Sequence, residues 1–223
     1  MNGIKKVIIL IGGPGSGKGT QAKKIVNGFG YGHISTGDLL RALDKDENGN
    51  LEDKEKLAQM KAGKLVSDDL IYKLSFAEMD KYLDVNKGVV LDGAIRNPKQ
   101  AVRYQKYFVD KNLGQEVIAI EVALSDSESF NRLTKRRMCS KCGAIIPWLE
   151  ATKDLSECPD CGGKLEIRID DNEEIIKQRI EDQGNKALKP IADYYEGLEI
   201  LKRVDGSLTI EEVEEQIGNI LRS

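Results

Sequence analysis

The chain has 223 residues, enough to bury a substantial core as one domain with room for an inserted module. Charged residues make up 32% and aromatic residues 5%, and the net charge of −3 argues against a nucleic-acid or membrane-surface partner for the chain as a whole. The apolar run at residues 7–11 is too short for a membrane span and lacks the pattern of a secretory signal. We therefore expect a cytoplasmic protein whose four cysteines stay reduced.

Apolar runs alternate with Lys/Glu-rich helical segments along the chain. Strand-like runs lie at residues 5–11, 33–35, 88–92, 117–124 and 200–204, and helical periodicity marks 67–83 and 98–112. Because the strands are apolar throughout, both faces of their sheet are expected to be covered, and the pattern predicts an α/β fold with a parallel sheet and flanking helices. Residues 41–66, with a turn at "DENGN", and the cysteine-bearing residues 138–167 are interpreted as insertions on this core.

A strand, a glycine-rich loop and a helix follow one another in "IILIGGPGSGKGTQAKKIV". Glycines in such a loop let backbone N–H groups converge on an anion, and the positive end of the following helix points to the same place. Lys18 would reach the outer phosphates of a nucleotide. The match to the Walker pattern is imperfect, because Gly19 takes the usual Ser/Thr position and the hydroxyl comes one place later. The predicted ATP-phosphate site consists of Gly12, Gly13, Pro14, Gly15, Ser16, Gly17, Lys18, Gly19 and Thr20.

Two C-x-x-C pairs lie fifteen residues apart, at Cys139, Cys142, Cys158 and Cys161. Four thiolates at this spacing suit one tetrahedral zinc ion, while disulfides would require an oxidising compartment. Four protein ligands leave no open position on the metal, so the zinc would be structural. A small segment with few apolar residues can gain its folding free energy from such a metal.

Further motifs occur in the order found in adenylate kinases, members of the nucleoside monophosphate kinase family. They are "HISTGDLLR" (33–41), "GKLVSDDL" (63–70), "LDGAIR" with Gln100 (91–100), "RLTKRR" (132–137), "RIDD" (168–171) and "PIADYY" (190–195). The chain resembles this family over essentially its whole length, and the cysteine segment is similar to the long lid of the zinc-bearing members. The resemblance implies a P-loop NTPase-type sheet of five parallel strands with flanking helices, a helical AMP-binding insert and a small β-rich zinc lid.

The same resemblance implies a division of the chain and a reaction. The core would comprise residues 1–34, 67–129 and 171–223, the insert 35–66 and the lid 130–170. The reaction would be reversible transfer of a phosphoryl group, ATP + AMP = 2 ADP, dependent on Mg²⁺ and carried out by a monomer. Such a transfer brings several phosphate charges together, and arginine binds two phosphate oxygens at once without losing its charge.

The resemblance also assigns roles to individual residues. Asp92 would organise the magnesium hydration shell, and Arg132 would also cover the donor base. Cations around the donor and the transferred group would be Lys18, Arg132, Arg136, Arg168 and Arg179, with Arg96 also in the catalytic set. AMP would meet Thr36, Arg41, Leu65, Val66, Gly93, Arg96, Gln100, Arg168 and Arg179.

Several of these residues also have structural interpretations. Of the adjacent Arg136 and Arg137, only the first is expected to point into the site. Asp170 and Asp171, with Glu173 and Glu174, fit a helix N-cap and an acidic first turn better than a catalytic role. His33, the single histidine, fits a structural role better than that of a general base.

The stretch "DGAIR" departs from the family, whose members usually read Asp-Gly-Phe-Pro-Arg. Ala94 and Ile95 stand where the resemblance expects Phe and Pro, and a cis bond before Ile95 would cost about 2.5–4 kcal/mol, so we expect a trans bond. Two hypotheses follow. The turn delivers Arg96 to the acceptor phosphate anyway, or the acceptor site is altered in affinity or nucleotide preference.

Two other functions compete with the adenylate kinase interpretation. One is a nucleoside monophosphate kinase with UMP, CMP or another acceptor; Gln100, placed to bond an adenine edge, and the long lid favour AMP. The other is a zinc-ribbon ATPase that binds nucleic acid, which requires a basic ribbon with exposed aromatics. The cysteine segment lacks both, since its charged and aromatic residues are Glu150, Asp154, Glu157, Asp160, Lys141, Lys153 and Trp148.

Overall fold

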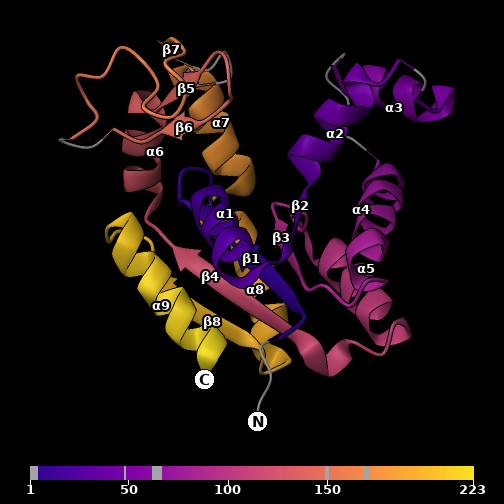
Figure 1. Ribbon diagram of the computed structural model, residues 1–223. Helices are drawn as coiled ribbons and strands as arrows, with labels where there is room; N and C mark the ends of the chain where they lie inside the picture. The colour runs from indigo at the N-terminus through magenta and orange to yellow at the C-terminus, as the bar shows by residue number, and fades with distance from the viewer. Residues whose placement is uncertain (1–4, 48, 62–66, 149–150, 168–170) are drawn as a thin grey trace.

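The computed structural model describes residues 5–47, 49–61, 67–148, 151–167 and 171–223. A five-stranded parallel sheet forms the centre of the molecule (Figure 1). Its strands lie in the order β2-β3-β1-β4-β8. They are β1 (Val7–Ile11), β2 (Gly32–Ser35), β3 (Val89–Asp92), β4 (Val117–Ala123) and β8 (Leu201–Asp205). The chain leaves β1 for one side of the sheet and later crosses to the other, and ligands bind at this kind of reversal in parallel sheets.

Helices cover both faces of this sheet, as the continuous apolar strands predict. α1 (Lys18–Phe29) and α9 (Ile210–Arg222) pack on one face, against side chains that include Ile8. α4 (Asp68–Leu83), α5 (Pro98–Asp110) and α8 (Asn185–Gly197) pack on the other, against side chains that include Ile9. Alternate residues of one strand therefore enter different cores. The predicted five-stranded α/β architecture is confirmed.

The polar segment after β2 is helical and stands apart from the sheet. It contains α2 (Thr36–Lys45) and α3 (Leu51–Lys61), and Leu43 and Leu57 of these helices pack with Leu70 of α4. Between them the backbone N–H of Gly49 donates to the carbonyl oxygen of Asp46 at 3.2 Å, so the predicted turn is present. Figure 1 shows this pair of helices across from the cysteine-rich segment, at the same end of the molecule.

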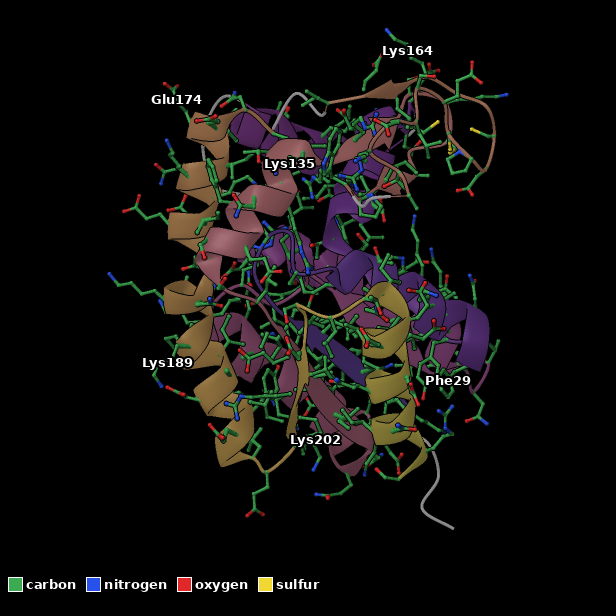
Figure 2. The ribbon with its side chains drawn as sticks, turned by 90° about the vertical axis from the view of Figure 1, so that its left-hand side faces the viewer. Phe29, Lys135, Lys164, Glu174, Lys189 and Lys202 are labelled. Carbon is green, nitrogen blue, oxygen red and sulfur yellow. The ribbon has the colours of Figure 1, made fainter. Side chains whose placement is uncertain are left out.

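The cysteine-rich segment folds into a small antiparallel sheet with the order β6-β5-β7. The strands are β5 (Arg137–Cys139), β6 (Ile145–Ile146) and β7 (Leu165–Glu166), and Figure 2 shows sulfur atoms gathered beside them. α6 (Asp126–Lys135) leads into this sheet, and α7 (Glu173–Gln183) follows it and packs against α6. The short 3-10 helix η1 (Gly114–Glu116) precedes β4. The predicted small β-rich segment is confirmed.

The start of α7 corrects one prediction. The helix is capped by Asn172, whose side chain accepts a backbone hydrogen bond at 2.9 Å, and not by Asp171. Glu173 and Glu174 do form the expected acidic first turn. Asp170 lies outside the described residues. Asn172 caps the helix because the carboxylate of Asp171 instead accepts hydrogen bonds from Arg136 and Arg179.

The other predicted elements differ from the structure by only a few residues. The helix expected at 98–112 ends at Asp110, because Asn112 takes a left-handed backbone conformation with φ of 59°. The strand expected at 200–204 is Leu201–Asp205. Among the described helices, none is both long and apolar enough to cross a membrane.

Candidate active site

The glycine-rich loop runs from the end of β1 to the start of α1. Gly17 precedes the helix with φ of 94°, a left-handed conformation that glycine adopts without strain. At Gly12 a Cβ atom would lie 2.8 Å from the carbonyl oxygen of Val122 in β4, so this approach requires glycine. The hydroxyl of Ser129 in α6 donates to the carbonyl oxygen of Pro14. The loop is therefore held between β4 and α6, with the N-terminal N–H groups of α1 beside it.

Lys18, the first residue of α1, folds back over the loop. Its Nζ donates to two loop carbonyl oxygens, at 2.5 and 2.8 Å. Burial is the main cause that lowers the pKa of Lys18 to about 8. The charges of Arg96, Arg179 and Arg136 lower it further, and the carboxylate of Asp92 acts in the opposite direction. Three of the predicted arginines and the predicted acid thus lie close enough to the phosphate loop to act on its lysine.

Asp92 ends β3 beside this loop. The backbone register pairs it with Leu10 of β1 on one side and with Ser35 of β2 on the other. Its Oδ2 lies 3.6 Å from Nε2 of His33 and 3.2 Å from the position that a Cβ atom of Gly19 would occupy. A serine at position 19, as in the usual Walker pattern, would therefore press on this carboxylate. Asp92 faces the phosphate loop and is not a solvated strand end.

A buried carboxylate holds two of the predicted arginines together. The side chain of Asp171 is 0% exposed. It accepts hydrogen bonds from Nε of Arg136 at 2.5 Å, from Nη2 of Arg136 at 2.8 Å and from Nη1 of Arg179 at 3.2 Å. A bidentate carboxylate fixes the plane of a guanidinium group. Asp171 therefore orients the two arginines, a role that the sequence does not reveal because 35 residues separate it from Arg136.

The other two arginines near the lid make different contacts. Nη2 of Arg132 lies 3.2 Å from the carbonyl oxygen of Ser207, in the connection between β8 and α9. Arg137 donates to carbonyl oxygens of residues 152–155 and lies over the ring of Trp148, with its Cζ 5.0 Å from the ring centroid. Arg137 thus braces the interior of the small sheet, whereas Arg136 binds Asp171 and acts on Lys18 through its charge.

Three of the residues predicted for the acceptor lie around Gly93. Oγ1 of Thr36 donates to the carbonyl oxygen of Gly93 at 2.9 Å, and Nε of Arg96 donates to the same oxygen at 3.2 Å. The side chain of Gln100 accepts from the backbone N–H of Arg96 at 2.6 Å. Arg41 lies on α2 with its side chain 62% exposed. Thr36, Arg96 and Gln100 thus lie together near the ends of β2 and β3, whereas Arg41 pairs with Asp38 of its own helix at 2.6 Å.

The unusual "DGAIR" turn keeps Arg96 at this place. The expected trans bond before Ile95 is confirmed, because no cis peptide bond occurs among the described residues. Ala94 and Ile95 are 2% and 7% exposed and belong to the same core cluster as residues of α5. The next helix, α5, begins at Pro98 and is capped by Asn97. Arg96 itself stays exposed and influences Lys18. The turn therefore leaves Arg96 close enough to the phosphate loop to act on Lys18, and its contact with an acceptor phosphate stays a prediction.

The four cysteines form one cluster. The Sγ atoms of Cys139 and Cys161 are 3.5 Å apart, those of Cys142 and Cys158 are 3.7 Å apart, and all four lie within 4.8 Å of one another. A tetrahedral zinc ion with bonds of about 2.3 Å needs sulfur–sulfur distances of about 3.8 Å. Backbone N–H groups of Cys142 and Lys141 donate to Cys139 and lower its pKa to about 6. The donor set fits a metal ion that binds thiolates.

The structure adds partners that sequence reasoning missed and leaves some predictions open. Ser129 fixes the phosphate loop, and Oδ1 of Asp68 accepts from Nε2 of Gln100 at 2.7 Å. Both residues lie in the first or second turn of a helix, where a polar residue is usually explained by capping. The predicted site residues Leu65, Val66 and Arg168 lie outside the described residues.

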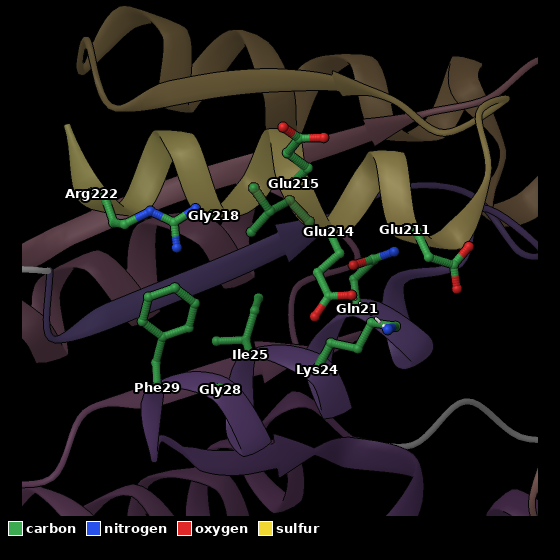
Figure 3. Close-up of a pocket in the computed structure, with 11 residues that line it drawn as sticks. Gln21, Lys24, Ile25, Gly28, Phe29, Glu211, Glu214, Glu215, Gly218 and Arg222 are labelled. Atoms are coloured by element: carbon green, nitrogen blue, oxygen red, sulfur yellow. Dashed lines mark hydrogen bonds and ion pairs between the residues drawn. The ribbon is translucent and has the colours of Figure 1, made fainter.

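A cavity of about 410 Å³ lies between α1 and α9 (Figure 3). Its wall includes the ion pair of Lys24 and Glu214, whose charged atoms are 2.6 Å apart. None of the predicted nucleotide-site residues lines it. The candidate site is therefore at the ends of the strands and not in this cavity.

Comparisons with known proteins agree with this arrangement. A family sequence model described as "Adenylate kinase" matches residues 10–200. The chain is 37% identical over 215 residues to the adenylate kinase of Thermodesulfovibrio yellowstonii, which covers 96% of this chain and 98% of that protein. It is 39% identical over 216 residues to that of Staphylococcus epidermidis, with 96% and 98% covered. It is 34% identical over 215 residues to that of Pyrococcus abyssi, with 96% and 94% covered. The match includes both the phosphate loop and the cysteine segment, and the chain belongs to the adenylate kinase family of phosphotransferases.

Proposed function

We propose that this protein transfers a phosphoryl group reversibly from ATP to AMP and forms two molecules of ADP. The observation that carries the proposal is the position of Lys18 on the phosphate loop, close to Arg96, Arg136 and Arg179. Several phosphate charges meet in such a transfer, and positive groups that are already in place stabilise them. The name adenylate kinase, which the relatives carry, supports AMP as the acceptor.

ATP would place its outer phosphates on the loop at residues 12–20 and on the N-terminal end of α1. Lys18 would exchange the loop carbonyl oxygens for phosphate oxygens. Arg132, beside the connection before α9, would cover the donor base. Arg136 and Arg179, oriented by Asp171, would meet the phosphoryl group in transit.

AMP would bind on the other side of the loop. Thr36 and Arg41 would hold its phosphate, with Arg96 next to the phosphoryl group, and Gln100 would meet the base. Leu65, Val66, Arg168 and Arg179 complete this site by resemblance to the family. The phosphate of AMP is already an ionised nucleophile, so the reaction requires no general base from the protein.

Magnesium fits the proposal as a partner of the donor phosphates. Bound there, it would neutralise charge on the phosphates. The side chain of Asp92 is 18% exposed at the end of β3, and a carboxylate at this position can hold waters of the metal's hydration shell. The small residue Gly19 leaves room for that carboxylate.

The proposal also covers the movement of the lid, the location of the enzyme in the cell and its oligomeric state. Zinc held by the four cysteines would keep the lid of residues 130–170 folded, while the insert of residues 35–66 would close over AMP and the lid over ATP. Closure would exclude water, so that hydrolysis does not compete with transfer. The remaining residues, 1–34, 67–129 and 171–223, would form the core of a cytoplasmic monomer with no nucleic-acid partner.

A coupled assay of ADP formation tests the proposed reaction. Purified protein is given ATP with AMP, UMP or CMP, with and without Mg²⁺. We expect turnover with AMP that requires the metal. Strong turnover with UMP or CMP and little with AMP would contradict the choice of acceptor. Salt-sensitive binding to DNA or RNA in a gel shift would instead favour the nucleic-acid-binding alternative.

A variant of Arg96 tests the acceptor site. Arg96→Ala removes the guanidinium group that we place on the transferred phosphoryl group, and mutations of this kind cost about 10²- to 10³-fold in kcat. The exposed Arg103→Ala on α5 is the control. A wild-type rate of AMP turnover in Arg96→Ala would show that the assignment is wrong.

A further inference from the structure

The side-chain amide of Gln100 is held at both ends. Its Oε1 accepts from the backbone N–H of Arg96 at 2.6 Å, and its Nε2 donates to Oδ1 of Asp68 at 2.7 Å. Gln100 is 6% exposed, so water has little access to replace these contacts. A backbone N–H can only donate and a carboxylate can only accept. Both contacts therefore demand the same orientation of the amide, and a rotation by 180° would break both.

Asp68 reaches Gln100 from a different element. It is the first residue of α4, where Ser67 caps the helix by accepting from the backbone N–H of Leu70. Leu70 is 1% exposed and packs with the helices of the insert, which fixes the start of α4. Gln100 lies 32 residues later, in the first turn of α5. The pair joins α4 to α5 beside the residues that gather around Gly93.

The orientation of an amide decides which purine it can pair with. At its Watson–Crick edge a 6-aminopurine presents an amino donor at position 6 beside an acceptor at N1. A 6-oxopurine presents the reverse, an oxygen acceptor at position 6 beside an N1–H donor. An amide offers one acceptor and one donor, so each orientation matches one of these two bases and opposes the other. A mismatch leaves buried polar groups without partners, which is a strong source of discrimination.

We propose that Asp68 is a positioning residue that sets the base specificity of the acceptor site. Its carboxylate holds the Gln100 amide in the orientation that pairs with a 6-aminopurine and rejects a 6-oxopurine. This inference rests on the proposed function, which places the base of AMP at Gln100. Asp68 holds the Gln100 amide more strongly than the backbone N–H of Arg96 does, because a hydrogen bond to a charged group is stronger than one between neutral groups.

The test compares AMP with IMP as acceptor, with ATP and Mg²⁺ present, and uses the ratio of their kcat/KM values. Asp68→Ala and Asp68→Ser remove the contact with Gln100, while Asp68→Asn keeps an oxygen that can accept from Nε2. Asp69→Ala, an exposed aspartate in the same helical turn, is the matched control. Thermal unfolding is measured for each variant to identify any that does not fold. If Asp68→Ala does not fold, Asp68→Ser replaces it in the test.

We expect the AMP/IMP ratio to fall by about tenfold in Asp68→Ala or Asp68→Ser. The loss should come from a higher KM for AMP and from gained turnover of IMP. Asp68→Asn should recover most of the ratio, and Asp69→Ala should keep all of it. An unchanged ratio in a folded Ala or Ser variant, or equal losses with both acceptors, would overturn the inference and leave the proposed function standing. A wild-type chain without AMP turnover would overturn both.

Discussion

At the scale of single residues, carboxylates accompany the cations of the site. Asp171 orients Arg136 and Arg179, and Asp92 acts on Lys18 from the neighbouring strand. Positive groups crowded together repel one another, so a fixed carboxylate keeps them in place until phosphates arrive. The cations could be predicted from the motifs, whereas Asp171 could not, because its partners lie on other elements.

Asp171→Asn tests this orienting role. The amide keeps the shape of the side chain but loses the charge and one acceptor, so the two arginines are no longer held. We expect kcat to fall by about 10- to 100-fold, the cost of small misplacements in an active site. Steady-state kinetics measure the effect, and Asp182→Asn, on the exposed side of α7, is the control. A kcat within twofold of wild type would contradict the role.

The lowered pKa of Lys18 predicts a pH dependence of ATP binding. The folded protein without nucleotide has a pKa of about 8 at this group, so Lys18 is mostly neutral above that pH. Bound phosphates favour the charged form and raise the pKa again. Binding should therefore take up a proton at pH values above about 8, and the affinity for ATP should weaken as the pH rises further.

Calorimetric titrations in buffers of different ionisation enthalpy measure this proton uptake. Lys18→Met has no group to protonate, so its uptake at pH 8.5 should fall below that of the wild-type chain. Equal uptake by both proteins would show that another group titrates.

At the scale of elements, the lid depends on its cysteines more than on its apolar side chains. Its buried cluster contains Ile146 and Leu165 together with Cys139 and Cys158. Two of the strands are two residues long, too short to be stable alone. The spacing of the cysteines was enough to predict this unit from the sequence. The brace that Arg137 forms with residues 152–155 was not predictable, since it depends on backbone carbonyl oxygens that no motif reveals.

Removal of the metal should therefore unfold the lid. We expect one zinc ion per chain by atomic emission. A chelator or Cys142→Ser should lower the melting temperature by about 5 °C or more, because the metal supplies folding free energy to this segment. Ser156→Ala, an exposed change in the same segment, should leave it unchanged. A chain without zinc that melts at the wild-type temperature would contradict a structural metal.

At the scale of the whole molecule, the apolar strands and the order of motifs were sufficient to predict the sheet and its flanking helices. They could not predict how the turn with Ala94 and Ile95 carries Arg96, because that depends on how both side chains fill the core. The insert and the lid stand at the same end of the sheet in Figure 1, on either side of the phosphate loop. Substrates that touch both should draw them together.

Small-angle scattering tests this closure. With ATP, AMP and Mg²⁺ at equilibrium, we expect the radius of gyration to fall toward about 17 Å, the value for a compact chain of this length. Adenosine alone contacts neither the phosphate loop nor the arginines and should produce no change. Identical scattering curves with and without nucleotides would contradict closure by these two segments.

The attachment of α6 to the phosphate loop has a mechanical consequence. Ser129 bonds the loop at Pro14, and Leu133, 0% exposed, packs close to Gly15. Up to Leu133 the helix is therefore attached to the phosphate loop. We expect the pivot of the lid to lie beyond this point, near Arg136. An arginine at the pivot would then swing with the lid while it stays within reach of the phosphate that it serves.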